Sequence, residues 1–473
     1  MFHERVKYFM NKYKKLLNNS FVFAIGNFGS KLMQFIMVPL YSYTLNTSDF
    51  GKVDVLTTVV TLLTLVICLD IPDAVFRFSL DRDGNRREIF SIGLIVVAVT
   101  SMLTIIIAIP IANTLRSYPV IYTAILLISN MFFSLVSNFA RAINFVKQFA
   151  TAGIINTFCM GILNLVLLLH FKMGMNGYML SMILGLVFAS FYLVMVCKLF
   201  SYFSFSYFST QTFRKMIRYS LPLIPNGFAW WLNSASDRIF ILTIIGAGAN
   251  GIYAMANKIP SMLNLVTSIF FQSWQISAVE EYDNEESKIF ITNVFNTFLS
   301  VLFAFSLIIM AFVRIIFKLF INSNYYGGWK LTPLLLLAVI YVSIASFLGT
   351  IYTATKKTGR VFSTTVYGAV VNVILTLVTL PIIGIAGAAL ANIVSFAIVS
   401  FFRLKDIIKM NKIIFDWKKF MLLNFIYIIA SLVSLGLPNI LSIVIIMSLV
   451  IVQCLIDKNM HNIIISLLSS LKF

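Results

Sequence analysis

Long apolar runs follow one another almost without interruption from Ser20 to Ile456. A soluble domain carries about 25% charged residues, whereas 11% of these 473 residues are charged and 60% are hydrophobic. Because the bilayer core holds no water, backbone polar groups there must bond within the chain, as in a helix or a closed barrel. The runs are too long and continuous for the short alternating strands of a barrel. The sequence therefore predicts an all-α polytopic membrane protein.

The apolar runs divide into about fourteen predicted transmembrane helices, at roughly twenty apolar residues per span. Their predicted bounds are 20–45, 51–78, 88–112, 118–141, 148–170, 177–200, 213–245, 251–280, 287–313, 331–355, 360–382, 386–403, 416–437 and 438–456. Residues 1–19 combine a basic face with an apolar face, a pattern typical of an amphipathic helix lying on the membrane surface.

Basic residues concentrate in alternate loops, which predicts the orientation of the chain. The segments on the side of the N-terminus carry Arg82, Arg86, Arg87, Arg141, Lys147, Arg214, Lys215, Arg218, Lys356, Lys357, Arg360, Arg403, Lys405, Lys409, Lys412, Lys418 and Lys419. The opposite loops hold only Lys52, Arg116, Lys172, Arg314, Lys318 and Lys330. We therefore expect both termini in the cytoplasm, and the net charge of +19 needs no nucleic-acid partner.

Polar side chains line one face of five predicted spans, and such groups are costly in hydrocarbon unless they face water or one another. The candidate cavity residues are Asn27, Lys31, Gln34, Asp54, Arg141, Asn233, Asp237, Arg238, Asn257, Lys258 and Asn264. The alternative is bonding between packed helices, worth about 0.6 kcal/mol per residue. That alternative is favoured for isolated residues such as Asn156, Asn164 and Asn372.

Three charged residues carry two specific hypotheses. Lys31 lies mid-span, where a lysine costs roughly 2.5 to 3.5 kcal/mol, so a water-filled cavity or a structural partner is expected beside it. Asp237 and Lys258 lie at a similar predicted depth, roughly 10 to 12 Å from the outer ends of their helices. We expect them to pair, either in a fixed bridge or in one state of a gate.

A weak internal repeat relates the two halves of the chain. Residues 38–55 match residues 238–255, and a helix restarts near glycine in each, at Gly51 and Gly251. Six spans per half is an arrangement found in transporters. The predicted organisation is therefore a surface segment 1–19, one lobe at 20–210, a second at 211–405, and two extra helices with an amphipathic tail at 406–473.

The sequence shows no group of residues with the spacing of a catalytic site. The four cysteines and three histidines are scattered without metal-ligand spacing, and the longest outer loop, 317–330, holds no paired carboxylates or histidine. No phosphate-binding loop of Walker type is present. We expect no catalytic site, metal or cofactor, and the identity of a coupling ion, H⁺ or Na⁺, stays open.

Two segments resemble the polysaccharide-biosynthesis (Wzx-type) flippases. The first runs from Phe23 to Phe78 and begins FAIGNFGSKLMQF; the second runs from Leu221 to Ala278 and includes Ser236-Asp237-Arg238. The resemblance implies the multidrug/oligosaccharidyl-lipid/polysaccharide (MOP) exporter fold, with two six-helix lobes around a cavity that opens alternately to either side of a bacterial cytoplasmic membrane. The implied cargo is an undecaprenyl-diphosphate-linked oligosaccharide, and membrane lipids, a polymerase and a chain-length regulator are the implied partners.

The resemblance leaves alternatives within the same fold. Relatives that move lipid II use cationic residues on the first, second and eighth spans, which Lys31 and Lys258 match in type and span. The second span departs from that pattern, since it carries Asp54 on its polar face and Arg77 only at its inner end. A lipid II flippase and a cation-coupled multidrug exporter are the alternatives to the oligosaccharide flippase.

Overall fold

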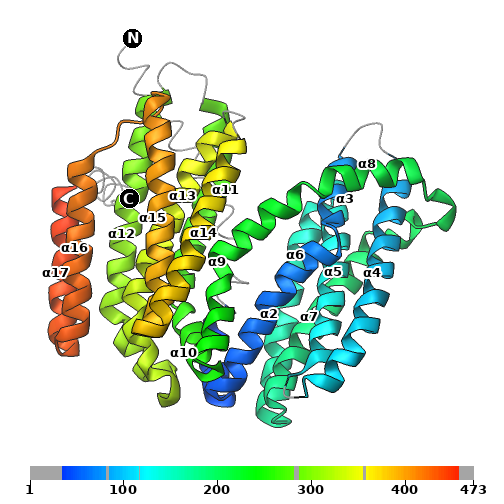
Figure 1. The fold of residues 1–473 in the computed structure, drawn as a ribbon, viewed down its shortest axis with the longest axis horizontal. Helices are drawn as coiled ribbons and strands as arrows, with labels where there is room; N and C mark the ends of the chain where they lie inside the picture. The colour runs from blue at the N-terminus through cyan, green and yellow to red at the C-terminus, as the bar shows by residue number, and fades with distance from the viewer. Residues whose placement is uncertain are drawn as a thin grey trace, which may run out of the picture. The chain divides into compact units, whose positions relative to one another are not determined.

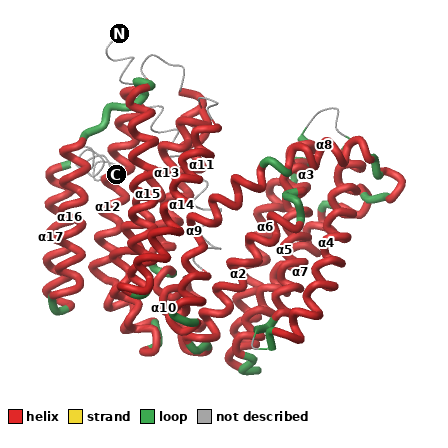
Figure 2. The backbone as a smooth tube through the Cα atoms, viewed as in Figure 1, coloured by secondary structure: helices red, strands yellow, loops and turns green. Residues whose placement is uncertain are grey.

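The computed structural model describes Met33 and residues 35–80, 85–116, 118–281, 287–354 and 358–457. Within these ranges the regular structure is helical and contains no strand (Figure 2). The α-helices are α2 (Thr47–Ile67), α3 (Ile71–Ser79), α4 (Arg86–Thr114), α5 (Val120–Ala142), α6 (Val146–Asn164), α7 (Gly174–Val196), α8 (Thr210–Ser220), α9 (Leu223–Ile244), α10 (Ala247–Asn257), α11 (Pro260–Glu281), α12 (Ser287–Phe320), α13 (Thr332–Ala354), α14 (Thr358–Ile383), α15 (Ile385–Lys409), α16 (Trp417–Gly436) and α17 (Asn439–Ile456). The all-α prediction is confirmed.

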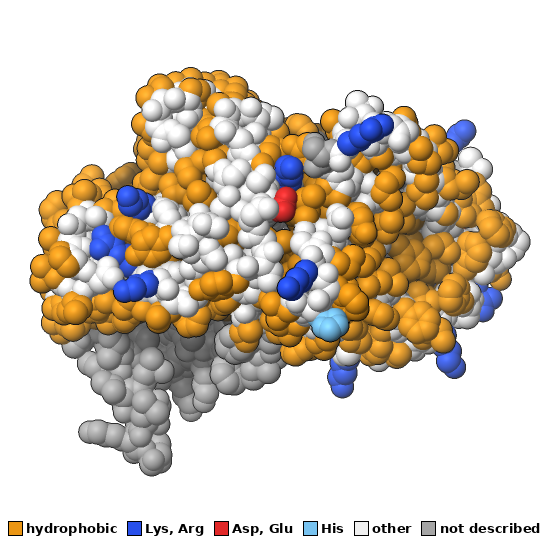
Figure 3. Space-filling model, turned by 90° about the horizontal axis from the view of Figure 1, so that it is seen from below, with side chains coloured by type: hydrophobic (Ala, Val, Ile, Leu, Met, Phe, Trp, Pro, Cys, Tyr) orange, Lys and Arg blue, Asp and Glu red, His pale blue; other side chains and the backbone are white. Residues whose placement is uncertain are grey.

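Eleven helical segments of the described chain are long and apolar enough to cross a membrane. Many large apolar side chains on them point outward; Met102 and Ile106, for example, are 66% and 63% exposed. Figure 3 shows hydrophobic side chains spread over the surface, with charged side chains scattered among them. Such exposure suits a lipid environment and not water. The chain is a multi-pass membrane protein.

Three predicted spans are interrupted, so their prediction as continuous helices was wrong. Span 51–78 breaks between α2 and α3, where Leu69 and Asp70 adopt positive φ of 52° and 50°. Span 213–245 breaks between α8 and α9, and span 251–280 breaks between α10 and α11. Proline lies at or just after each break, where it lacks an N–H and restricts the residue before it. Hydropathy alone does not reveal these breaks in the helices.

Contacts divide the chain into two compact units, of which the first is Phe28–Gly251. Its described part packs α5 against α2, α3, α4 and α7, and α6 against α7. Buried Asn164 donates to the Tyr41 hydroxyl at 3.0 Å and accepts from the Ser181 hydroxyl at 2.5 Å. This network confirms the prediction that Asn164 joins packed helices.

The described part of the second unit lies within residues 252–457. In it α15 packs on α13 and α14, and α12 packs on α16 and α17 (Figure 1). Asn372 Nδ2 on α14 lies 2.9 Å from Asn392 Oδ1 on α15, which confirms the helix-joining prediction for Asn372. The predicted lobe boundary at 210/211 falls between the first two residues of α8, whereas these units divide after Gly251.

One basic residue lies where the loop prediction did not place it. Arg403 was counted with the cytoplasmic loops, but its side chain is 1% exposed within α15. It donates to carbonyl and hydroxyl oxygens of α13 and α14, because a buried guanidinium must have each N–H satisfied. A charged residue at the end of an apolar run can thus be buried in a helix and not exposed in a loop.

Candidate functional site

The starts of α2 and α10 meet within the first unit. α2 begins at Thr47 and α10 at Ala247, which reproduces the 200-residue offset of the predicted repeat. Asn46 caps α2 by accepting the Asp49 N–H at 2.7 Å, and Gly246, with φ of 125°, precedes α10. In each half of the repeat, a helix therefore begins at this contact.

Glycine allows the two helix starts to touch through their backbones. A Cβ on Gly51 would lie 2.0 Å from the Ala247 carbonyl oxygen, and a Cβ on Gly251 would lie 1.9 Å from the Thr47 carbonyl oxygen. The contact is reciprocal, with each glycine facing the first residue of the other helix. Glycine is the only residue that permits so close an approach. The glycines that marked the repeat in sequence thus have a packing role in three dimensions.

An ion pair lies beside this glycine contact. Arg238 Nε of α9 is 3.0 Å from Asp54 Oδ2 of α2, and the two side chains are 24% and 17% exposed. Fully buried Asn250 of α10 donates to the Gly51 carbonyl oxygen at 2.8 Å and lies 3.4 Å from Asp54 Oδ2. The Trp231 indole of α9 donates to the Thr58 carbonyl oxygen of α2 at 3.0 Å. We call Asp54, Arg238, Asn250 and the two glycines the α2–α10 junction.

The structure brings two predicted cavity residues, Asp54 and Arg238, into direct contact. Asn233 and Asp237 are buried on α9, at 1% and 3% exposure. Sequence reasoning missed Asn250, although an amide one residue before the repeat glycine was a usable signal.

Three other predicted residues, Arg141, Asn257 and Asn264, have surroundings of their own in the structure. Arg141, at the end of α5, stacks over the rings of Phe76 and Phe149. Asn257 donates to the Tyr253 carbonyl oxygen of its own helix, and Asn264 is exposed on α11. Asn27, Lys31 and Gln34 fall outside the described residues.

The predicted Asp237–Lys258 pair joins residues that belong to different compact units. Lys258 occupies the turn between α10 and α11. Their pairing stays a prediction.

Exchanging the charges of Asp54 and Arg238 tests the ion pair that the structure shows. Asp54→Ala or Arg238→Ala should each destabilise the protein by a few kcal/mol, because one mostly buried charge loses its partner. The double variant Asp54→Arg with Arg238→Asp should recover at least half of that loss. Thermal unfolding of the purified protein measures this. A double variant no more stable than the worse single one would contradict the pairing.

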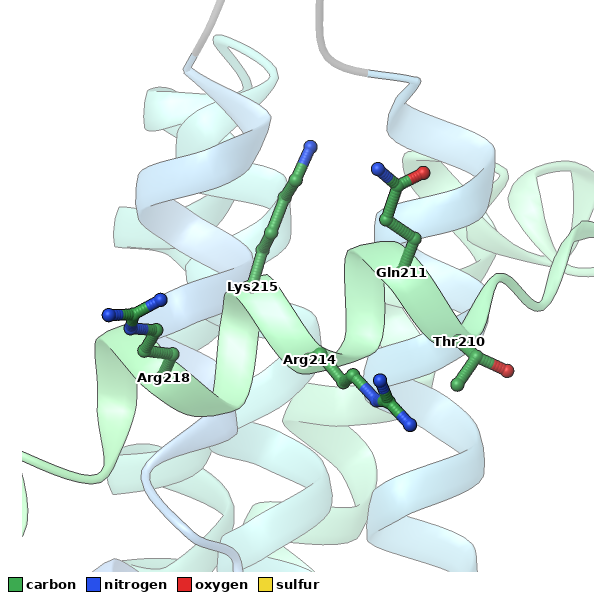
Figure 4. Close-up of a pocket in the computed structure, with 5 residues that line it drawn as sticks. All are labelled: Thr210, Gln211, Arg214, Lys215 and Arg218. Atoms are coloured by element: carbon green, nitrogen blue, oxygen red, sulfur yellow. The ribbon is translucent and has the colours of Figure 1, made fainter.

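A second cluster of charge lies on α8, where a pocket of about 410 Å³ is lined by Thr210, Gln211, Arg214, Lys215 and Arg218. Figure 4 shows Lys215 and Gln211 extending to one side of the helix while Arg214 extends to the other. Met216 and Ser220 of the same helix are buried, and α8 packs on α3. An amphipathic helix with this pattern suits a membrane surface. The basic side chains diverge, so they do not converge on one small ligand.

The junction lies within a region that matches a known family. Residues 16–276 match the sequence profile of the polysaccharide biosynthesis protein family, which is more than half of the chain. The chain belongs to this family. No curated protein matches the chain, so the family assignment rests on that profile.

Solved structures with the same fold are transporters. The lipid II flippase MurJ in its inward closed conformation aligns with a TM-score of 0.73 at 13% identity, over 93% of this chain and 98% of MurJ. An inward-facing multidrug resistance MATE family transporter aligns with a TM-score of 0.64 at 13% identity, over 81% and 96%. A MOP superfamily transporter from Pyrococcus furiosus aligns with a TM-score of 0.51 at 14% identity, over 84% and 96%. This polysaccharide biosynthesis protein therefore has the MOP transporter fold.

Proposed function

We propose that this protein moves an undecaprenyl-diphosphate-linked oligosaccharide from the cytoplasmic to the outer leaflet of a bacterial cytoplasmic membrane. The observation that carries the proposal is the family match over residues 16–276, on a chain with the fold of lipid and drug transporters. The product serves a surface polysaccharide, and a polymerase and a chain-length regulator are its expected partners. Both termini are proposed to be cytoplasmic, from the distribution of basic loops.

The charges of the candidate cavity residues favour an anionic cargo. The set contains four bases, Lys31, Arg141, Arg238 and Lys258, and two acids, Asp54 and Asp237. Asp54 and Arg238 neutralise each other, so bases outnumber acids among the remaining residues. A cation exporter needs unpaired acids along its path, whereas a diphosphate needs cations. Lipid II carries the same diphosphate, so charge does not separate it from an oligosaccharide lipid. The resemblance separates the two cargoes at the second span. Lipid II flippases carry a cation there, whereas this chain carries Asp54, which favours the oligosaccharide.

The α2–α10 junction is suited to act as an outer gate in alternating access. In the proposed orientation Thr47 and Ala247 lie at the outer ends of their helices. The junction joins the two sequence halves by backbone contact and one ion pair, with no interlocking side chains at the glycines. At about 3 Å and an effective dielectric near 20 the ion pair gains about 5 kcal/mol before desolvation is subtracted. This Coulomb energy is lost when the gate opens, but water that enters the gate hydrates both ions and offsets the loss.

A disulfide across the junction should stop transport reversibly. A Cβ at Gly248 would lie 3.5 Å from Thr47 Oγ1, which places the pair Thr47→Cys with Gly248→Cys within disulfide reach. The background is a variant without the native Cys68, Cys159, Cys197 and Cys454. Oxidised protein in vesicles should lose nearly all flipping of a labelled undecaprenyl-diphosphate oligosaccharide, and a reductant should restore it.

Three cargoes and two controls make this experiment decisive. Lipid II and a cationic dye, assayed beside the oligosaccharide lipid, test the alternative functions; efficient transport of either in its place would replace the proposed cargo. The single variants Thr47→Cys and Gly248→Cys should be insensitive to oxidant. Full transport by the cross-linked protein would show that the junction does not open.

A further inference from the structure

A cavity of about 490 Å³ lies between α12, α16 and α17, within the second unit. Asn293 and Asn296 come from the first turns of α12, Lys418 and Lys419 from the start of α16, and Gln453 from the end of α17. Pockets for small molecules have volumes of roughly 300 to 1,000 Å³. The cavity belongs to the second unit, whereas the α2–α10 junction belongs to the first.

One wall of the cavity is a closed polar network. Lys419 Nζ lies 2.9 and 3.0 Å from the two carboxylate oxygens of Asp457 and donates to the Asn296 carbonyl oxygen at 3.1 Å. The Ser300 hydroxyl also donates to Asp457. The Lys419 and Asp457 side chains are only 15% and 8% exposed. A buried pair satisfied in this way is neutral as a unit, so it fixes the wall without attracting a net charge.

Gln453 holds the same wall from α17. Its side-chain Nε2 donates to the Ser300 carbonyl oxygen at 2.9 Å, and the residue is 2% exposed. Its Oε1 has no hydrogen-bond partner and almost no accessible surface, so a ligand in the cavity does not reach this oxygen. The side chain therefore fixes the wall and does not bind the ligand.

The remaining charges of the cavity balance each other. Asp416 and Lys418 are both exposed and both line the cavity. Asp416 Oδ1 already caps α16 by accepting the Lys419 N–H at 3.0 Å, which leaves its second oxygen for a ligand. One acid and one base in the opening, above a neutral wall, match a ligand that carries one charge of each sign.

The cavity also continues into an apolar wall along α16. Leu423 and Ile426 are buried in that wall, and Leu422 is 37% exposed. α16 begins and α17 ends here, so the polar part of the cavity lies at the ends of two spans, where phospholipid head groups meet water. An acyl chain can follow the leucines while the head group occupies the polar part.

We propose that this cavity binds a zwitterionic phospholipid, with its phosphate at Lys418 and its head-group ammonium at Asp416. The lipid would fill the space between the last two helices and α12. The site depends on the membrane placement of α16 and α17 and is independent of the cargo proposed above.

Lipid retention by the intact, detergent-purified protein tests this site. Native mass spectrometry after titration with phosphatidylethanolamine, phosphatidylglycerol or undecaprenyl phosphate compares the three head groups directly. The wild-type protein should retain phosphatidylethanolamine in preference to both others. Asp416→Asn, which keeps the oxygen that caps α16 but removes the charge, should lower that retention several-fold.

Surface variants keep the test independent of folding. Lys418→Ala and the cavity-blocking Leu422→Trp change exposed residues and should each lower phosphatidylethanolamine retention several-fold. Lys405→Ala removes an exposed lysine from α15 and should have no effect. Equal retention of phosphatidylglycerol, preferential retention of undecaprenyl phosphate, or unchanged retention in Lys418→Ala and Leu422→Trp would overturn the proposal.

Discussion

Replacing Gly51 or Gly251 with alanine is expected to lower transport at least tenfold. The added methyl group would lie about 2 Å from a backbone carbonyl oxygen of the opposite helix. Backbone cannot rotate away as a side chain does, so α2 and α10 must separate, and forced overpacking costs about 1 to 3 kcal/mol or more. The junction would then favour its open state, and a transporter held in one state completes fewer cycles.

Gly248→Ala is the matched control for these two variants. It adds the same methyl group to α10, the helix that carries Gly251, but that methyl group would lie 3.5 Å from Thr47 Oγ1 in ordinary contact. Flipping in vesicles measures the transport rate, and the reactivity of Thr47→Cys with an impermeant thiol reagent measures opening. The glycine variants should raise this reactivity. Normal flipping by both Gly51→Ala and Gly251→Ala would show that the close approach is not needed.

Arg403→Ala is expected to cost about 3 to 5 kcal/mol of stability, because each buried acceptor that it leaves without a donor costs roughly 1 to 3 kcal/mol. The Arg403 guanidinium donates to the Ala345 carbonyl oxygen at 2.7 Å and to the Thr364 and Thr365 hydroxyls at 3.0 Å. It lies so close to Gly349 that a Cβ there would be 2.8 Å from Nη1. One side chain thus joins α13, α14 and α15, and its removal leaves several buried acceptors unsatisfied.

Thermal unfolding in detergent measures the loss, with Arg360→Ala as the control. Arg360 lies 3.3 Å from Asp406, but its side chain is 66% exposed, and exposed pairs contribute about 0 to 1 kcal/mol. Arg403→Lys should remain well below wild type, because one ammonium cannot replace the planar set of guanidinium donors. Equal melting temperatures for Arg403→Ala and Arg360→Ala would contradict the joining role.

Sequence periodicity and hydropathy determined the class of fold and part of its internal order. Long apolar runs indicate membrane spans directly. Backbone polar groups that have no water to bond must bond one another, as they do in helices. The repeat predicted helix starts at Gly51 and Gly251; the helices begin four residues earlier, at Thr47 and Ala247, with the same 200-residue offset. The two glycines mark the point where the backbones touch. Isolated asparagines such as Asn164 were correctly predicted to join helices, because an amide in hydrocarbon needs a partner.

Tertiary structure alone decided which charged groups meet. Depth along a span can be read from sequence, but neighbouring residues point about 100° apart around a helix. Sequence reasoning therefore sought a partner for Asp237, whereas the structure shows Arg238, one residue later, beside Asp54. The burial of Arg403 and the assembly of Gln453 with Lys419 and Asp457 likewise depend on how distant helices are rotated and packed. A linear pattern of hydropathy contains the depth of each residue but not its direction, and direction decides which side chains make contact.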